Sequence, residues 1–175
     1  MIKAVKCLLA LGLFAGMASM ASATTVDAEK AFLGDLKKSI PAEKIVSIDE
    51  LHKTWEAVQA GKSNAVIIDI RTHDEFDAGH ILGSNNIDSG HAYTMPKKIT
   101  DPDTEIWVFC RTQHRASYFV SMLYKYGYKN VYLAEGGVVA WIEKGYPLAN
   151  EYLGEITVAK YNKQLKEDFT YREGH

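Results

Sequence analysis

Short apolar runs alternate with amphipathic segments along most of this 175-residue chain. Residues 65–70 (AVIIDI) form a continuous run rich in β-branched side chains, and residues 105–109 (EIWVF) form a second. Such runs are typical of strands that are buried on both faces of a parallel sheet. Shorter strand candidates lie at 45–47, 84–87 and 131–133. Because strands alternate with helices, the pattern predicts an α/β domain with a mostly parallel sheet.

Apolar residues at helical spacing predict helices between and around these strands. The expected helices are 27–39, one capped by Asp49 that ends at Gly61, a turn at 75–78, one from Ala116 to Gly127, and one through Val138 that stops at Gly145. A looser segment around His91 interrupts the pattern, and residues 152–169 are expected to form a helix that docks on the domain or on a second subunit.

Residues 1–23 have the order of a secretory signal peptide. Lys3 and Lys6 precede an apolar run of about 14 residues, and Ala21-Ser22-Ala23 follows. The run is shorter than the roughly 20 residues that cross a bilayer, and Cys7 lies at its front, where lipid attachment is not expected. We therefore expect cleavage near Ala23 and a periplasmic or secreted protein without a membrane span.

Removal of this segment leaves 22 acidic and 18 basic residues, a net charge of about −4. A mildly acidic chain without basic runs is a poor candidate for binding nucleic acid. The remaining length of about 150 residues is that of one domain. We expect a helical lead-in at 24–44, the domain at 45–148, and a C-terminal extension at 149–175.

Cleavage would also leave Cys110 as the one cysteine of the mature chain. An unpaired cysteine in an exported protein is either a reactive thiol or a small buried hydrophobe, and composition alone favours the second. Cys110 directly follows a predicted strand and precedes a predicted helix, and Asp69 and Arg71 lie at the end of another strand. Ligands of parallel sheets bind at the carboxyl ends of the strands, so position favours a functional thiol.

The loop after this strand (residues 107–117, WVFCRTQHRAS) is basic. Backbone N–H groups of a tight loop and the start of a helix stabilise anions, a thiolate included. Arg111 and Arg115 remain charged near neutral pH, and His114 adds charge depending on pH. The loop therefore indicates an activated sulfur nucleophile in an anion-binding site.

Several chemistries are excluded or weakened. Dithiol exchange needs a second cysteine, and no metal ligands cluster near Cys110, so neither a metal nor a cofactor is expected. No histidine is marked as a general base. Phosphoryl transfer and sulfur transfer through the cysteine remain open.

Three segments, in order over roughly 45–148, resemble the rhodanese (sulfurtransferase) family. Val66–Ile87 is similar to the family's strand with Asp-x-Arg and its Glu-Phe and Gly-His-Ile motifs, 108–117 to its active-site loop, and Gly127–Leu148 to its closing Gly-Gly…Trp…Gly-x-Pro segment. The resemblance implies a five-stranded parallel sheet with helices on both faces. It also implies that Cys110 accepts sulfur and that the loop residues Arg111, Thr112, Gln113, His114 and Arg115 bind the substrate and cradle the persulfide.

The family's mechanism implies a small anionic sulfur donor, thiosulfate or polysulfide, and a thiol, cyanide or sulfite as acceptor. A monomer and a homodimer both remain open. A cysteine-dependent phosphatase or arsenate-handling enzyme on the same fold is disfavoured, because its Cys-x5-Arg motif requires arginine where this chain has Ala116. A non-catalytic binding module is disfavoured because such modules usually lack the loop cysteine.

Asp69 with Arg71 and the Gly136-Gly137 pair have plainer interpretations than direct participation in the chemistry. Asp69 and Arg71 are expected to support the site by internal hydrogen bonding. Gly136-Gly137 is expected to form a tight turn below the site.

Many family loops have glycine at the position of Gln113. A positive φ there would strain glutamine; the alternative is a differently turned loop with the amide at its rim.

Overall fold

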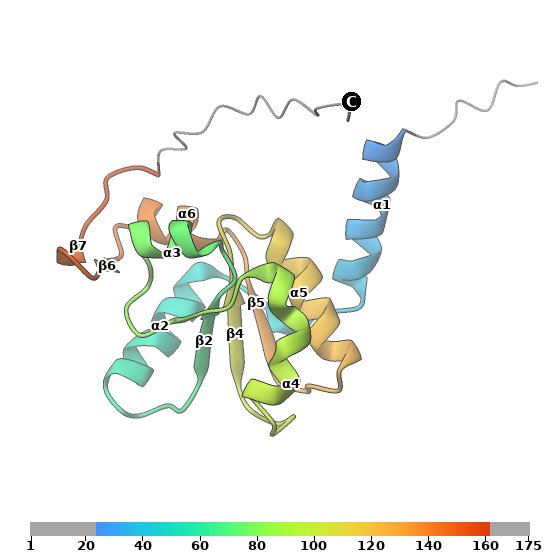
Figure 1. Ribbon diagram of the computed structural model, residues 1–175, viewed down its shortest axis with the longest axis horizontal. Coiled ribbons are helices and arrows are strands. Elements are labelled where there is room, and N and C mark those ends of the chain that lie inside the picture. Colours follow the sequence, from blue (N-terminus) through green and yellow to red (C-terminus); the bar gives the residue numbers. More distant parts are fainter. Residues whose placement is uncertain (1–23, 162–175) are drawn as a thin grey trace, which may run out of the picture.

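The computed structural model describes residues 24–161, and the predicted five-stranded parallel sheet is confirmed (Figure 1). Its strands are β1 (Ile45–Val46), β2 (Val66–Asp69), β3 (Asn85–Asn86), β4 (Ile106–Phe109) and β5 (Val131–Ala134). They are ordered β1-β5-β4-β2-β3, and all pairs are parallel. The helices are α1 (Thr25–Lys38), η1 (Ala42–Lys44), α2 (Ile48–Gln59), α3 (His73–Ala78), η2 (Ser89–Thr94), α4 (Met95–Lys98), α5 (His114–Lys125) and α6 (Gly137–Glu143).

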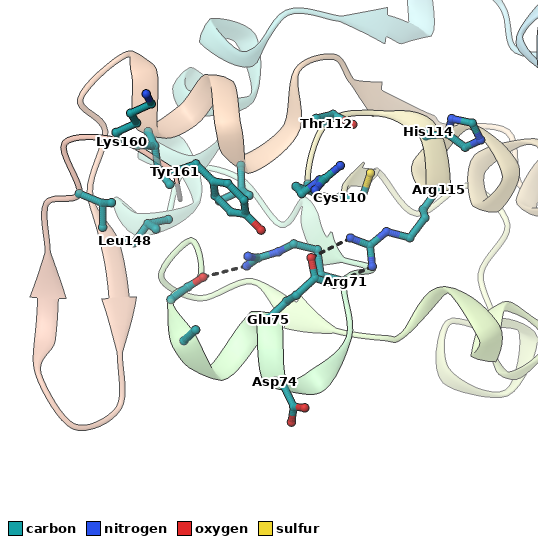
Figure 2. Close-up of a pocket in the computed structure, with 16 residues that line it drawn as sticks. Arg71, Asp74, Glu75, Cys110, Thr112, His114, Arg115, Leu148, Lys160 and Tyr161 are labelled. Atoms are coloured by element: carbon teal, nitrogen blue, oxygen red, sulfur yellow. Dashed lines mark hydrogen bonds and ion pairs between the residues drawn. The ribbon is translucent and has the colours of Figure 1, made fainter. Parts of the chain in front are cut away.

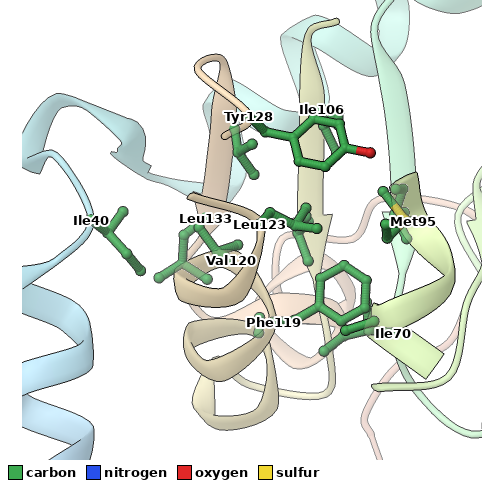
Figure 3. Close-up of a cluster of buried hydrophobic side chains, with 14 of the residues drawn as sticks. Ile40, Ile70, Met95, Ile106, Phe119, Val120, Leu123, Tyr128 and Leu133 are labelled. Atoms are coloured by element: carbon green, nitrogen blue, oxygen red, sulfur yellow. The ribbon is translucent and has the colours of Figure 1, made fainter. Parts of the chain in front are cut away.

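The central strands are apolar throughout because both of their faces are covered. Ile68 and Val108 belong to a core cluster with Phe119 of α5. The same cluster includes Met95 of α4 (Figure 3). The alternate residues of the same strands, among them Trp107, pack in a second cluster with residues of α2 and α6. Helices therefore cover both faces, as the resemblance implies.

The register of the sheet determines where the site lies. Asp69 at the end of β2 pairs with Phe109 at the end of β4 and with Asn86 of β3. Since parallel strands end at one edge of the sheet, Arg71 and Cys110 emerge next to each other there.

The Gly136-Gly137 pair forms the predicted tight turn. Both residues have positive φ, 80° and 56°, which glycine adopts without strain. The turn brings the start of α6 against the cysteine loop so closely that a Cβ on Gly137 would collide with the backbone of Cys110 and Arg111. Only glycine at position 137 permits this contact.

Two expectations about local structure are wrong. Helix α2 is capped by Ser47 rather than Asp49, because Ser47 forms a reciprocal capping box with Glu50. The looser segment around His91 contains a helix pair, η2 and α4.

The C-terminal extension also differs from the expected helix. Within the described residues it forms an antiparallel hairpin of β6 (Leu148–Asn150) and β7 (Gly154–Ile156). Positions 162–169 of the expected helix lie outside the described residues. The hairpin is joined to the domain through backbone hydrogen bonds between His80 and Ala149, 2.7 and 3.0 Å long.

Replacement of Gly137 tests the close packing of α6 on the loop. Gly137→Ala should lower the free energy of unfolding by about 2–4 kcal/mol, because it adds a steric clash to backbone strain. Gly145→Ala is the matched control: Gly145 also has positive φ, 75°, but open space around it, so a loss of roughly 1–2 kcal/mol is expected. Urea denaturation measures both, and equal losses would contradict the close packing.

Candidate active site

Cys110 opens onto a cavity of about 1020 Å³ at the carboxyl edge of the sheet (Figure 2). The cavity is lined by three groups of side chains, from the cysteine loop and α6, from β2 and α3, and from the C-terminal extension. They are Cys110, Arg111, Thr112, His114, Arg115, Val138 and Ile142; Arg71, Asp74, Glu75, Ala78 and Gly79; and Leu148, Val158, Lys160 and Tyr161. The last group is called the C-terminal wall below.

The cysteine loop directs its backbone N–H groups away from α6. The carbonyl oxygens of Cys110 and Arg111 accept hydrogen bonds from the N–H groups of Val138 and Val139, 2.9 and 3.1 Å long. In a trans peptide the C=O and N–H groups point in opposite directions, so the two following N–H groups point away from α6.

The N–H groups of this loop also lack acceptors. Within residues 24–161, no protein acceptor is present for the N–H groups of residues 111–116, which run into the first turn of α5. Cys110 itself is 1% exposed. A buried thiol beside unused donors and a helix start is an environment that stabilises a thiolate or a persulfide anion.

Arg115 is oriented by a carboxylate from α3. Its Nη1 and Nη2 donate to Oε2 and Oε1 of Glu75, at 2.7 and 2.9 Å. Burial disfavours the ionised form of Glu75, but the hydrogen bonds from Arg115 and Thr72 outweigh it and lower the pKa of its carboxyl from 4.5 to about 2. The hydrogen bond to Glu75 raises the pKa of Arg115 against its burial, and negative charge on Cys110 acts in the same direction. The guanidinium thus stays charged close to the thiol.

His114 is turned toward the N-terminal helix. Its Nε2 lies 2.8 Å from Oε1 of Glu29 in α1, and the same oxygen accepts a 2.7 Å hydrogen bond from Tyr118. The hydrogen bond from Tyr118, reinforced by His114, lowers the pKa of Glu29. His114 lines the cavity while this contact ties the loop to α1.

Gln113 does not line the main cavity. Its φ is −176°, an extended conformation, so the strain that a positive φ would impose is absent. Its amide donates a 2.6 Å hydrogen bond to Glu135, and its side chain lines a separate hollow of about 310 Å³ shared with Thr112 and α1. The differently turned loop of the two alternatives is therefore the one observed, and of the five predicted substrate-binding residues Gln113 alone does not line the main cavity.

Asp69 and Arg71 form a buried pair beneath the site. Arg71 Nε donates to both carboxylate oxygens of Asp69, at 3.0 and 2.9 Å, and its Nη2 donates to the carbonyl of Gly79 at 2.8 Å. The amide of Asn86 donates to the carbonyls of both residues. This network joins the ends of β2 and β3 to α3, and Arg71 also lines the cavity.

Sequence reasoning missed two contributors. The sequence places Glu75 only in a helical turn and in a family motif, because its contact with Arg115 spans 40 positions of the chain. Apart from Leu148, the C-terminal wall lies outside the family resemblance, and scattered apolar positions are the only signal of it in the sequence.

Within the described part of the chain, no three His, Cys, Asp or Glu side chains gather as metal ligands. No helix between residues 24 and 161 is long and apolar enough to cross a membrane.

The comparisons with known proteins agree with this geometry. The family model of the rhodanese-like domain matches residues 48–144, so the chain belongs to the rhodanese-like domain family. The uncharacterized protein YqhL of Bacillus subtilis is 32% identical over 88 residues, which cover 50% of this chain and 69% of that protein. Thiosulfate sulfurtransferase 18 of Arabidopsis thaliana is 26% identical over 129 residues, 66% of this chain and 92% of the relative.

Among solved structures, the polysulfide-sulfur transferase homodimer of Wolinella succinogenes matches with a TM-score of 0.57 and 25% identity, covering 74% of this chain and 93% of that one. The resemblance to the rhodanese family is therefore confirmed by sequence and by fold.

The Glu75–Arg115 ion pair predicts a pH-dependent contribution to stability. The pKa of Glu75 is lower in the folded state, so its carboxylate stabilises the fold above about pH 4.5, and this contribution is lost as the pH falls toward 2. Glu75→Gln should lower the free energy of unfolding by about 1–2 kcal/mol at pH 7, since the partly exposed pair is screened by solvent.

Urea denaturation from pH 7 to 3 measures the difference between the two proteins, which should shrink below pH 4.5. Asp74→Asn is the control: the neighbouring Asp74 has no ion pair within residues 24–161, and its replacement should change stability by less than about 0.5 kcal/mol. A difference that stays constant over this range would contradict the assignment.

Proposed function

We propose that this protein is a sulfurtransferase that carries sulfane sulfur as a persulfide on Cys110. The observation that carries the proposal is the thiol of Cys110 among the unused N–H groups of residues 111–116 in a rhodanese-like domain. The names of two similar proteins, a thiosulfate sulfurtransferase and a polysulfide-sulfur transferase, support the reaction class.

In the first half-reaction the Cys110 thiolate attacks the outer sulfur of thiosulfate. A bond forms between Sγ and that sulfur, the sulfur–sulfur bond of thiosulfate breaks, and its electron pair leaves with sulfite. Cys110 then carries a persulfide anion with one negative charge. Loop N–H groups stabilise this anion, and Arg111 and Arg115 attract the dianionic donor. A polysulfide reacts in the same way and releases a shorter polysulfide.

In the second half-reaction a nucleophile removes the outer sulfur. Cyanide or a thiolate attacks it, the bond to Sγ breaks, and the electron pair returns to Cys110 as thiolate. The product is thiocyanate or an organic persulfide. No net oxidation occurs over the cycle, so no cofactor is required.

The position after Arg115 argues for sulfur over phosphate. A Cys-x5-Arg loop would place arginine at position 116, but Ala116 is completely buried in the core cluster beneath α5. The loop arginine of this chain is Arg115, which is held by Glu75 on the opposite side of the cavity. A tighter loop suits one sulfur atom better than a tetrahedral phosphate.

Sulfur loading can be tested directly by intact mass. Incubation of the protein with thiosulfate or polysulfide should add the mass of one sulfur atom, and cyanide should remove it again with release of thiocyanate. Cys110→Ser should abolish the gain, whereas Ser117→Ala, a small change at a nearby buried residue, should leave loading in place. An unchanged wild-type mass with both donors, together with burst release from an aryl phosphate, would replace the proposal with a phosphatase.

We further propose that the protein is exported. The capping box of Thr24 and Asp27, which starts α1, directly follows Ala23, so cleavage there would leave every described element intact. Expression of the full chain in a Gram-negative host should yield a periplasmic protein whose first residue is Thr24.

The cleavage motif requires small residues at Ala21 and Ala23 but not between them. Ala23→Tyr should therefore block processing, while the matched variant Ser22→Tyr should be processed normally. Intact mass of the periplasmic fraction measures both, and processing of Ala23→Tyr at Thr24 would contradict the assignment.

A further inference from the structure

The C-terminal wall is anchored on both of its sides. At its start, Leu148 belongs to β6, which is joined to the domain by the His80–Ala149 backbone hydrogen bonds, and the Asn150 amide donates to the carbonyl of Asp77 at 2.7 Å. After β7, Val158 and Tyr161 are partly buried against the second core cluster. The segment is thus packed against the domain and lines the same cavity as Cys110.

The cavity has two unlike sides. One side carries charged residues, Arg111 and Arg115 of the cysteine loop and Arg71, Asp74 and Glu75 from the end of β2 and from α3, whereas the side formed by α6 and the C-terminal wall is apolar except for Lys160. The apolar lining consists of Val138, Ile142, Leu148, Val158 and the ring of Tyr161. An inorganic anion gains no favourable free energy from contact with such a surface, whereas burial of an apolar organic group against it is favourable.

The size of the cavity leads to the same conclusion. Its volume of about 1020 Å³ slightly exceeds the range of about 300–1,000 Å³ for sites that hold drug-sized organic ligands. Thiosulfate has five non-hydrogen atoms and fills only the region next to Cys110. Most of the cavity therefore remains for a larger reactant.

Tyr161 is the wall residue best placed to contact such a reactant. Figure 2 shows its ring projecting from the C-terminal segment into the cavity, with the hydroxyl directed toward the side of Arg71. Within residues 24–161 this hydroxyl has no hydrogen-bond partner. The ring presents an apolar face between the segment and the cysteine loop.

We propose that Val158 and Tyr161 select the acceptor, and that the acceptor is an organic thiol with an apolar body. The inference rests on the proposed sulfur transfer and specifies its second half-reaction. The acceptor thiolate attacks the outer sulfur of the Cys110 persulfide, the bond to Sγ breaks, and an organic persulfide leaves while Cys110 returns to thiolate. The apolar body lies against the C-terminal wall during this step.

Three acceptors of different bulk test the proposal on sulfur-loaded full-length protein. Cyanide has no organic body, 2-mercaptoethanol has a small polar one, and 2-phenylethanethiol has an apolar ring. Tyr161→Ala should lower kcat/KM for 2-phenylethanethiol by about tenfold, mainly through KM, because it removes apolar contact area. The values for cyanide and 2-mercaptoethanol should stay within about twofold of the wild type.

Two variants serve as matched controls. Tyr161→Phe keeps the ring and loses the hydroxyl, so it should retain the wild-type preference. Tyr152→Ala removes an aromatic side chain from the same extension, but Tyr152 is 83% exposed and does not line the cavity, so no acceptor should be affected. An equal loss for all three acceptors in Tyr161→Ala would mark a structural role and overturn the inference.

Direct binding separates this inference from the proposed reaction. The unreactive analogue 2-phenylethanol should bind the unmodified wild type, measured by saturation-transfer NMR, and should bind several-fold more weakly to Tyr161→Ala but not to Tyr161→Phe. Absence of sulfur loading would overturn the proposed function and the acceptor step with it, but not the binding of an apolar organic group by the C-terminal wall. Equal binding of 2-phenylethanol by all three proteins would overturn the proposal that the C-terminal wall binds the acceptor.

Discussion

The site depends on two hydrogen bonds between segments far apart in the chain. The N–H groups of Val138 and Val139 hold the carbonyls of Cys110 and Arg111, and only glycine at 137 lets α6 approach closely enough to do so. With these carbonyls directed to α6, the next N–H groups point the other way. Preorganised donors of this kind stabilise developing negative charge without rearrangement during the reaction. The orientation of the N–H groups in the loop is therefore a consequence of how α6 begins.

Ion pairs with carboxylates reduce the free positive charge that the sequence suggests for the site. Arg71 is neutralised by Asp69, Arg115 is held by Glu75, and His114 contacts Glu29. Among the loop cations, Arg111 is the one without an ion pair within residues 24–161. Because paired side chains are fixed in orientation, they contribute position more than free charge. In the proposed reaction, the backbone N–H groups would therefore stabilise the persulfide more than the number of basic residues in the loop suggests.

Local patterns in the sequence were sufficient for the fold and for the position of Cys110 in it. The apolar runs at β2 and β4 predicted buried strands because both faces of each strand are covered, and the strand-loop-helix order placed Cys110 at the ligand-binding edge. Side-chain pairing was beyond such patterns: the partner of Arg115 lies 40 positions away, and the conformation of Gln113 depends on Glu135. The N-cap of α2 was misplaced because Ser47 and Asp49 are both good caps, and only the reciprocal bond to Glu50 distinguishes them.

Helix α3 couples the two sides of the cavity. Its Glu75 orients Arg115 on the cysteine loop, while the residues that follow it carry the backbone bonds to β6. A two-stranded hairpin is marginally stable by itself, so β6 and β7 depend on these bonds and on the packing of Val158 and Tyr161. The loop that would perform the sulfur chemistry lies within residues 48–144, which match the family, whereas the C-terminal wall lies beyond them. In the proposed function, selectivity for an acceptor would thus vary through the extension while the cysteine loop, held by α6 and α3, stays unchanged.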